Sequence, residues 1–305
     1  NLEEVLKTDP KTVGAIKIFM GSSTGNMLVD SEQTLTNIFS KVDHLIATHC
    51  EDEATIRKNT ALFREKYGDD MPIKYHPQIR NNEACFLSSS LAVRLAKKYG
   101  VQGLMMLPPM RYKADSRETV TYFKKVANST TLPIMIYNNP VDYGIEVTLD
   151  MLSELSKCNN IQAVKESTRD ISNVSRMRNR FGDRFAILCG VDTLALESII
   201  MGADGWVAGL VCAFPKETVA ICNLAKAGKI KEAIAIYRWF LPLLELDIST
   251  KLVQNIKLAE VATGIGTENV REPRLPIVGE ERKRVLDILN EGLKTRPILP
   301  DYKNL

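Results

Sequence analysis

Gly103-Leu104-Met105-Met106-Leu107 is a short apolar run, and two more follow it, at Pro133-Ile134-Met135-Ile136-Tyr137 and Ile161-Gln162-Ala163-Val164-Lys165. A longer amphipathic segment separates each run from the next, at residues 116–129 and 148–157. Runs of this length predict buried strands, and the segments between them predict helices. Because parallel strands need crossover connections of this kind, the sequence predicts consecutive β/α units.

The same unit repeats toward both ends of the chain. Further strands are expected at residues 14–20, 44–48, 185–189 and 204–208, and further helices at 82–99 and 193–201. Such a repeat forms either an open doubly wound sheet or a closed (β/α)8 barrel. A nucleotide-binding open sheet is disfavoured, because Gly21-Ser22-Ser23-Thr24-Gly25 is too short to match a GxGxxG loop.

Polar residues at the ends of these strands favour the barrel. His49, Tyr137 and Lys165 each end or follow an apolar run, and Gly190-Val191-Asp192 follows another. The carboxyl ends of barrel strands converge on one mouth. We therefore predict an α/β fold of the (β/α)8 TIM-barrel type. Seven strands are evident where a closed barrel needs eight, and residues 71–75 are a poor candidate, so the prediction includes an incomplete or irregular barrel.

Composition and charge exclude several classes of protein. The chain has 305 residues, 45% hydrophobic and 25% charged, which is typical of a protein with a buried core. The net charge is +3 without a basic block, so no nucleic acid partner is expected. The sequence has no apolar window long enough for a membrane span, no basic leader and no CxxC pair, so we expect a cytoplasmic protein without a membrane partner.

Lys165 and Tyr137 form the strongest chemical constellation. Burying an ammonium group is costly and usually favours the neutral amine, which is the form that attacks a carbonyl or imine carbon. A tyrosine one strand away supplies a hydroxyl for proton transfer. Taken singly, Lys165 could pair with a carboxylate and Tyr137 could pack in the core. Their joint occurrence favours a Schiff-base enzyme with these two residues as its catalytic groups.

From Gly103 to the C-terminus the chain resembles the dihydrodipicolinate synthase and N-acetylneuraminate lyase family. The motifs are Leu107-Pro108-Pro109, Tyr137-Asn138-Asn139-Pro140, Lys165-Glu166-Ser167, Gly190-Val191-Asp192 and Gly202-Ala203-Asp204-Gly205-Trp206-Val207. The resemblance implies a barrel with a C-terminal helical domain, usually homotetrameric, in which Lys165 forms an imine with a 2-keto acid and Tyr137 relays protons. Substrate contacts are implied at Asn139, Gly190 and Val207. Family members carry two tyrosines after the Pro-Pro pair, where this chain has Met110-Arg111 followed by Tyr112.

Three C-terminal stretches resemble one subfamily more closely. They are Tyr237-Arg238-Trp239-Phe240-Leu241-Pro242-Leu243-Leu244, Lys251-Leu252-Val253-Gln254 and Arg271-Glu272-Pro273-Arg274-Leu275-Pro276. These look like the deaminases of 1-pyrroline-4-hydroxy-2-carboxylate, which implies formation of 2-oxoglutarate semialdehyde and ammonia. The resemblance implies no cofactor.

Residues 1–100 are instead similar to dihydroorotase, a metal-dependent amidohydrolase. The similarity runs through the stretch from Gly14 to Asn26, then Ala47-Thr48-His49-Cys50-Glu51-Asp52, then His76-Pro77-Gln78-Ile79-Arg80. It implies zinc ligands at Lys17 and His49. The chain has only three histidines, and two ligands cannot hold a pair of metal ions, so we expect no metal. The loop at Ser22, Ser23 and Thr24 could instead bind the carboxylate of a small acid.

These resemblances predict a chimera of two barrel families joined near Gly100. The expected domains are a dihydroorotase-like segment at 1–100, a lyase-like barrel segment at 101–217 and a helical region at 218–305, with helices at 219–227, 230–246, 251–262 and 280–294. The expected function is a Schiff-base lyase or deaminase acting on a small 2-keto or imino acid, as a homo-oligomer. Two alternatives remain open: a dihydroorotase-type zinc hydrolase and a catalytically silent barrel.

Overall fold

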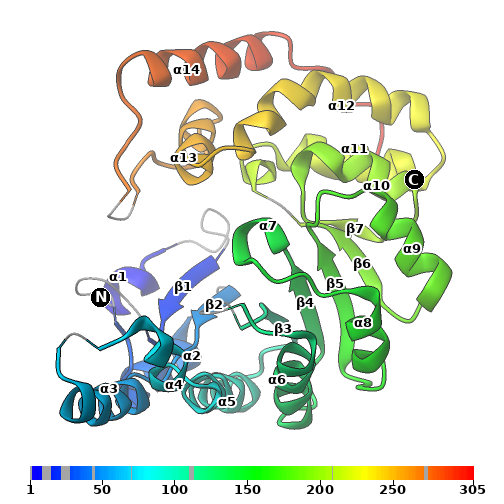
Figure 1. The fold of residues 1–305 in the computed structure, drawn as a ribbon. Helices are drawn as coiled ribbons and strands as arrows, with labels where there is room; N and C mark the ends of the chain where they lie inside the picture. The colour runs from blue at the N-terminus through cyan, green and yellow to red at the C-terminus, as the bar shows by residue number, and fades with distance from the viewer. Residues whose placement is uncertain are drawn as a thin grey trace. The chain divides into compact units, whose positions relative to one another are not determined.

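The computed structural model describes residues 2–8, 15–21, 28–42, 45–69, 71–109, 113–207, 209–270 and 274–305. The chain divides into two compact units, Asn1–Gln162 and Ala163–Leu305 (Figure 1). This division falls inside a strand, at a different place from the junction near Gly100 that the sequence resemblances predict.

The seven predicted strands are confirmed, each to within two residues at either end. They are β1 Ala15–Phe19, β2 Leu45–His49, β3 Leu104–Met106, β4 Ile134–Asn138, β5 Ile161–Glu166, β6 Ala186–Cys189 and β7 Gly205–Trp206. The pairs β1 with β2, β3 with β4, β5 with β6, and β6 with β7 are all parallel. Residues Ile73–Tyr75 form a 3-10 helix, so the described residues contain no eighth strand there. The fold is of the α/β, (β/α)8 TIM-barrel type.

Most helices of the first unit begin at side-chain caps. Ser31, Asp52, Asn81, Asp115 and Thr148 each accept a hydrogen bond from a backbone N–H in the first turn of the helix that follows. Asp115 also forms a capping box with Glu118. The helices are α1 Leu2–Leu6, α2 Glu32–Lys41, α3 Glu53–Tyr67, α4 His76–Ile79, α5 Asn82–Lys98, α6 Ser116–Asn128, α7 Pro140–Tyr143 and α8 Leu149–Leu155.

The second unit continues the β/α pattern and ends in helices, as predicted. Its helices are α9 Ser172–Phe181, α10 Ala195–Ile200, α11 Pro215–Lys226, α12 Ile230–Leu244, α13 Leu252–Ala262 and α14 Gly279–Lys294. Three 3-10 turns, η2 Asp192–Leu194, η3 Leu210–Cys212 and η4 Glu245–Asp247, follow strand or helix ends. Phe214, Phe240 and Leu243 are fully buried where α11, α12 and α14 pack together (Figure 1). This apolar core fixes the C-terminal helices in place.

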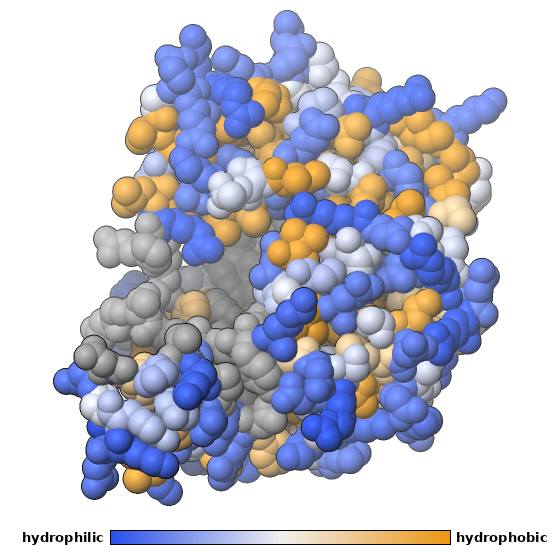
Figure 2. Space-filling model, viewed as in Figure 1, coloured by the Kyte–Doolittle hydropathy of each residue, from blue (hydrophilic) through white to orange (hydrophobic). Residues whose placement is uncertain are grey.

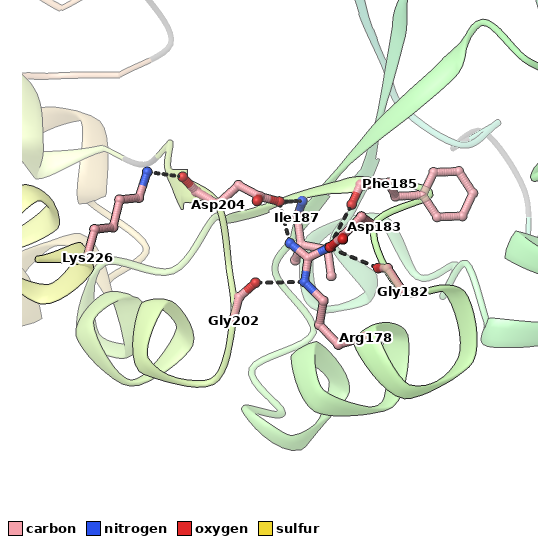
Figure 3. A network of polar contacts seen from close by, with 8 residues as sticks. All are labelled: Arg178, Gly182, Asp183, Phe185, Ile187, Gly202, Asp204 and Lys226. Carbon is pink, nitrogen blue, oxygen red and sulfur yellow. Dashed lines mark hydrogen bonds and ion pairs between the residues drawn. The ribbon is translucent and has the colours of Figure 1, made fainter. Parts of the chain in front are cut away.

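Arg178 of α9 ties the amino ends of β6 and β7 together (Figure 3). Its guanidinium donates to the carbonyl oxygens of Gly182, Phe185 and Gly202 and to the carboxylates of Asp183 and Asp204. Asp204 Oδ2 also accepts the backbone N–H of Ile187 at 2.7 Å, and its carbonyl oxygen accepts from Lys226. These bonds satisfy backbone carbonyl and N–H groups at the amino ends of β6 and β7 that have no partner within the sheet.

The described surface in Figure 2 is mostly hydrophilic, with small hydrophobic groups between the charged side chains. None of the helices in the described ranges is long and apolar enough to cross a membrane. The five cysteines whose side chains are described are free thiols: Cys50, Cys158, Cys189, Cys212 and Cys222.

Candidate active site

Lys165 lies near the carboxyl end of β5 and is 8% exposed. Successive side chains of a strand point to opposite faces, so Lys165 and Ser167 share one direction and Glu166 takes the other. The turn after β6 lies directly against the first pair. A β-carbon built on Gly190 would come within 2.8 Å of Lys165 Cε and 2.0 Å of Ser167 Oγ. The backbone at Gly190 therefore forms a wall beside the lysine, and a β-carbon there would force the Lys165 and Ser167 side chains to shift.

Glu166 holds the strand end from the opposite side. Its Oε1 accepts the backbone N–H of Thr168 at 2.8 Å, and its Oε2 accepts the side-chain amide of Asn173 in α9 at 2.9 Å. Glu166 is buried, and a buried carboxylate is tolerated when such donors satisfy it. The backbone of β5 is thus fixed immediately beside Lys165.

Arg169, in the loop that follows, has a φ of 64°. It is the only non-glycine residue with a positive φ among those described. A left-handed backbone is costly for any residue with a β-carbon and tends to occur near functional sites. The loop after the lysine therefore carries local strain.

Tyr137 belongs to the first unit, in β4, and is partly buried. The side-chain amide of Asn139 donates to the Tyr137 hydroxyl at 3.2 Å and to Asp142 Oδ2 at 2.6 Å. Asn139 also caps α7. Asn138 is fully buried, and its side chain makes two hydrogen bonds with the backbone of Val147. The Tyr-Asn-Asn-Pro motif therefore anchors the loop after β4 and orients the Tyr137 hydroxyl.

Tyr143 packs edge-on against the Tyr137 ring, with centroids 5.5 Å apart. Burial, with smaller contributions from Tyr137 and Asp142, raises the pKa of Tyr143 to about 12. Tyr143 is therefore a neutral, rigid neighbour of Tyr137 at physiological pH.

Asp192 lies in the 3-10 turn after β6 and is fully buried. Its Oδ1 accepts the indole N–H of Trp206 at 3.0 Å, and its Oδ2 accepts the backbone N–H of Leu210 at 2.8 Å. Burial, followed by the repulsion from Asp247, raises the pKa of Asp192 to about 7. The sequence placed Gly190-Val191-Asp192 at the mouth but carried no signal for the link to Trp206.

Val207, a predicted substrate contact, is partly exposed, and its backbone N–H donates to the Cys189 carbonyl at 2.8 Å. It therefore lies at the carboxyl end of β7, beside the end of β6. The predicted carboxylate loop, Ser22, Ser23 and Thr24, lies outside the described residues, as do Met110, Arg111 and Tyr112.

Lys17 and His49, the two metal-ligand candidates, lie on the paired strands β1 and β2. Their backbone register pairs Lys17 with Ala47 and His49 with Phe19. Within the described ranges there is no group of three or more His, Cys, Asp or Glu side chains that could hold a metal ion.

Comparison with known protein families gives the class of protein: a class I aldolase-type lyase. The sequence model of the Dihydrodipicolinate synthetase family matches residues 87–292. The chain belongs to this family, whose enzymes need no metal cofactor, act on small substrates and are typically homo-oligomers.

Two curated relatives illustrate the sequence match. The 4-hydroxy-tetrahydrodipicolinate synthase of Methanothrix thermoacetophila is 29% identical over 199 residues, which are 65% of this chain and 68% of that protein. The enzyme of the same name from Pelodictyon phaeoclathratiforme is 31% identical over 199 residues, which are 64% of this chain and 67% of that protein. Each match therefore spans about two thirds of the relative.

The structural likeness extends further along the chain. The structure of 4-hydroxy-tetrahydrodipicolinate synthase from Methylacidiphilum fumariolicum SolV aligns with a TM-score of 0.63 at 24% identity, covering 92% of this chain and 97% of that one. At this coverage most of residues 1–100 must be included. Most of the first hundred residues therefore share the fold of this family's structures.

Proposed function

We propose that this chain is a class I lyase or deaminase that forms an imine between Lys165 and a small 2-keto acid or cyclic imino acid. The observation that carries the proposal is the buried Lys165 side chain with the Gly190 backbone packed against it. Such a wall limits the rotamers of the lysine and holds its amine in one place, as covalent catalysis needs.

The chemistry assigned to each residue is simple. Lys165 Nζ would attack the carbonyl or imine carbon, forming the new C–N bond. The Tyr137 hydroxyl would carry a proton to the departing oxygen or ring nitrogen, with Asn139 fixing its orientation. Gly190 and Val207 would line the site, and Ser22, Ser23 and Thr24 would hold the substrate carboxylate. In the pyrroline the released ring nitrogen stays bonded to C5, so the 4-hydroxyl would next leave as water with a proton from C3, and proton shifts would move the double bond to an imine at C5. One water would hydrolyse the C5 imine and release ammonia, and a second would hydrolyse the C2 imine and free Lys165, for a net consumption of one water.

For the particular substrate we propose 1-pyrroline-4-hydroxy-2-carboxylate, converted with one water to 2-oxoglutarate semialdehyde and ammonia. The support is the set of subfamily-like C-terminal stretches. Trp239 and Phe240, from the first of them, stack with ring centroids 5.5 Å apart, and Phe240 is fully buried. These two aromatic residues act by shaping the C-terminal core.

Borohydride trapping tests the proposal. After incubation with pyruvate and reduction, peptide mass spectrometry should find the adduct on Lys165. Lys165→Arg should abolish the adduct, whereas Lys216→Arg, on the exposed start of α11, should leave it unchanged. An unmodified Lys165 with adducts elsewhere would contradict the proposal. Ammonia release from the pyrroline hydroxycarboxylate tests the particular substrate.

We also propose that residues 1–100 derive from dihydroorotase-like sequence joined near Gly100 to the lyase-like residues 101–217 and the helical residues 218–305. The family match begins at residue 87, which supports a change of ancestry in this region but places it before residue 87 rather than at Gly100. The residues present do not fit the binuclear zinc site of that ancestry, since Lys17 and His49 alone supply two ligands. We therefore expect metal analysis to find no stoichiometric zinc pair and turnover to be weaker than in a complete family member. Trapping and turnover both absent would favour a silent barrel.

The expected setting is a homo-oligomer in the cytoplasm. Family membership supports the assembly, and the absence of clustered cysteines in the sequence supports a reducing compartment. Light scattering of the purified protein measures the assembly directly.

A further inference from the structure

The Asp192 carboxylate joins the turn after β6 to the segment after β7. The strand pairing ends at Cys189 and Trp206, and one more backbone bond joins Val207 to Cys189. Beyond that point the Asp192 carboxylate provides the connection, because it accepts the Trp206 indole N–H and the Leu210 backbone N–H. The two carboxylate oxygens of Asp192 therefore connect the turn after β6 to the segment after β7, beyond the last backbone hydrogen bond between the two strands.

The turn is also held from the helical side. The Tyr237 hydroxyl of α12 donates to the Asp192 carbonyl oxygen at 2.9 Å and accepts the Ala195 backbone N–H at 3.1 Å. Trp206 packs edge-on against the Tyr237 ring, with centroids 6.4 Å apart. The backbone and the carboxylate of Asp192 thus have separate anchors.

This turn is the wall beside the imine-forming lysine. Gly190 precedes Asp192 by two residues, and its backbone N–H donates to the Glu166 carbonyl at 2.8 Å. Its α-carbon faces the Lys165 stem so closely that a β-carbon would reach 2.8 Å from Cε. A shift of the turn would therefore change the space in which the lysine amine lies.

We propose that Asp192 is a positioning residue for Lys165, acting through Gly190 by tying the turn after β6 to the segment after β7. The inference rests on the proposed role of Lys165 in imine formation. A displacement of about 1 Å at a reacting group can cost roughly a hundredfold in rate, so loss of the Asp192 hydrogen bonds should lower the rate of imine formation at Lys165.

The protonation of Asp192 should set the strength of the tie. An ionised carboxylate can accept hydrogen bonds on both oxygens, whereas a protonated one turns one oxygen into a donor. The raised pKa of Asp192, about 7, places this change near neutrality. The titratable or charged groups that face this region are Asp247 of η4, Cys189 of β6, Cys212 of η3, Tyr237 of α12, Glu166 of β5, and Lys257 and Glu260 of α13.

The experiment compares three variants of the full chain with the unaltered protein. Asp192→Asn keeps the shape but replaces one acceptor oxygen by an amide donor. Trp206→Phe removes one N–H donor while keeping a ring. Glu217→Gln is the matched control, because Glu217 is an equally buried carboxylate in α11 that pairs with Arg296 at 2.6 Å, away from the turn. Borohydride trapping with pyruvate measures imine formation, and thermal melting checks folding.

We expect Asp192→Asn to slow trapping roughly ten- to a hundredfold above pH 7. The rate ratio of unaltered protein to Asp192→Asn should shrink as pH falls through about 7, because protonation loosens the tie in the unaltered protein only. Trp206→Phe should slow trapping less, and Glu217→Gln should lower the melting temperature without slowing trapping.

A second readout separates this inference from the proposed function. The rate at which acetic anhydride acylates Lys165, followed by peptide mass spectrometry, needs no substrate. If the unaltered protein traps no 2-keto acid, the proposed function fails. The acylation rate of Lys165 in the unaltered protein, compared with that in Asp192→Asn, then still tests the positioning role. A folded Asp192→Asn chain that matches the unaltered protein in both rates at every pH overturns the inference. Should Asp192→Asn fail to fold, unchanged rates in Trp206→Phe overturn it instead.

Discussion

The backbone of Gly190 lies so close to Lys165 that a β-carbon on the glycine would come within 2.8 Å of the lysine Cε. The same β-carbon would lie 2.0 Å from Ser167 Oγ. Real side-chain carbons do not approach this closely, so a side chain at position 190 would require the Lys165 and Ser167 side chains to move. This contact carries the first prediction.

Gly190→Ala should displace the Lys165 side chain and slow borohydride trapping by at least about tenfold, because a shift near 1 Å at a reacting group costs up to roughly a hundredfold. Adding Ser167→Ala removes the closer of the two clashes and should recover part of the rate, while the contact with Lys165 Cε remains. A Gly190→Ala chain that traps pyruvate at the unaltered rate would show that the wall is not needed.

Tyr137→Phe should lower kcat about a hundredfold or more, since positioned proton transfer contributes roughly 10²- to 10⁴-fold. The hydroxyl accepts the Asn139 amide, so Asn139→Ala should have a smaller effect in the same direction. Steady-state ammonia release from the pyrroline hydroxycarboxylate measures both. Equal rates in the phenylalanine variant and the unaltered chain would remove Tyr137 from the mechanism.

Arg169→Gly should stabilise the protein by about 0.5–1 kcal/mol, because glycine adopts a positive φ without the steric cost that a β-carbon brings. Arg169→Ala is the matched control: it also removes the guanidinium but keeps the β-carbon, so it should not stabilise. Urea unfolding measures both free energies. Equal stability of the two variants would mean that the strain is absent.

Stability should fall as pH rises from about 4 to about 7 on account of Asp192. Its folded pKa, about 7, is raised above the ordinary carboxyl value of 3.8, so the folded state binds the proton more tightly than the unfolded state does. The stabilisation is complete below about pH 4 and lost above about pH 7, with a span of roughly 4 kcal/mol. Asp192→Asn should flatten the free energy of unfolding across this window. Glu154 and Asp170 have pKa values lowered to about 2 by hydrogen bonds, so they act at lower pH and with the opposite sign.

Arg178→Lys should destabilise the second unit by about 2–4 kcal/mol. A lysine cannot reproduce the planar set of donors that serves three carbonyl oxygens and Asp204 (Figure 3), and partly buried acceptors would be left open. Arg176→Lys is the control, because its pair with Asp170 is more exposed. Thermal melting compares the two, and a similar small shift in both would contradict the prediction.

Much of the architecture was predictable from local pattern. The apolar runs ending at Tyr137 and Lys165 predicted β4 and β5 to within one residue, because a short apolar run between two amphipathic segments is typical of a buried parallel strand. In the structure Asp115 and Thr148 cap helix starts by accepting bonds from residues three positions on, so the helices predicted at 116–129 and 148–157 begin within one residue of the expected place. Lys165 stood out because a lysine ending an apolar strand is rare.

The sequence by itself therefore determined the strands and most helices, and it predicted Lys165 and Tyr137 as the chemical groups of the candidate site. Only the tertiary structure decided that the Gly190 backbone packs against the Lys165 side chain. It also decided that Asp192 accepts hydrogen bonds from Trp206 and Leu210, and that Arg169 adopts a left-handed backbone. These features depend on distances between residues from different strands and on the path of one loop. Local periodicity carries no information about them, because they arise only when packing brings separate segments into contact.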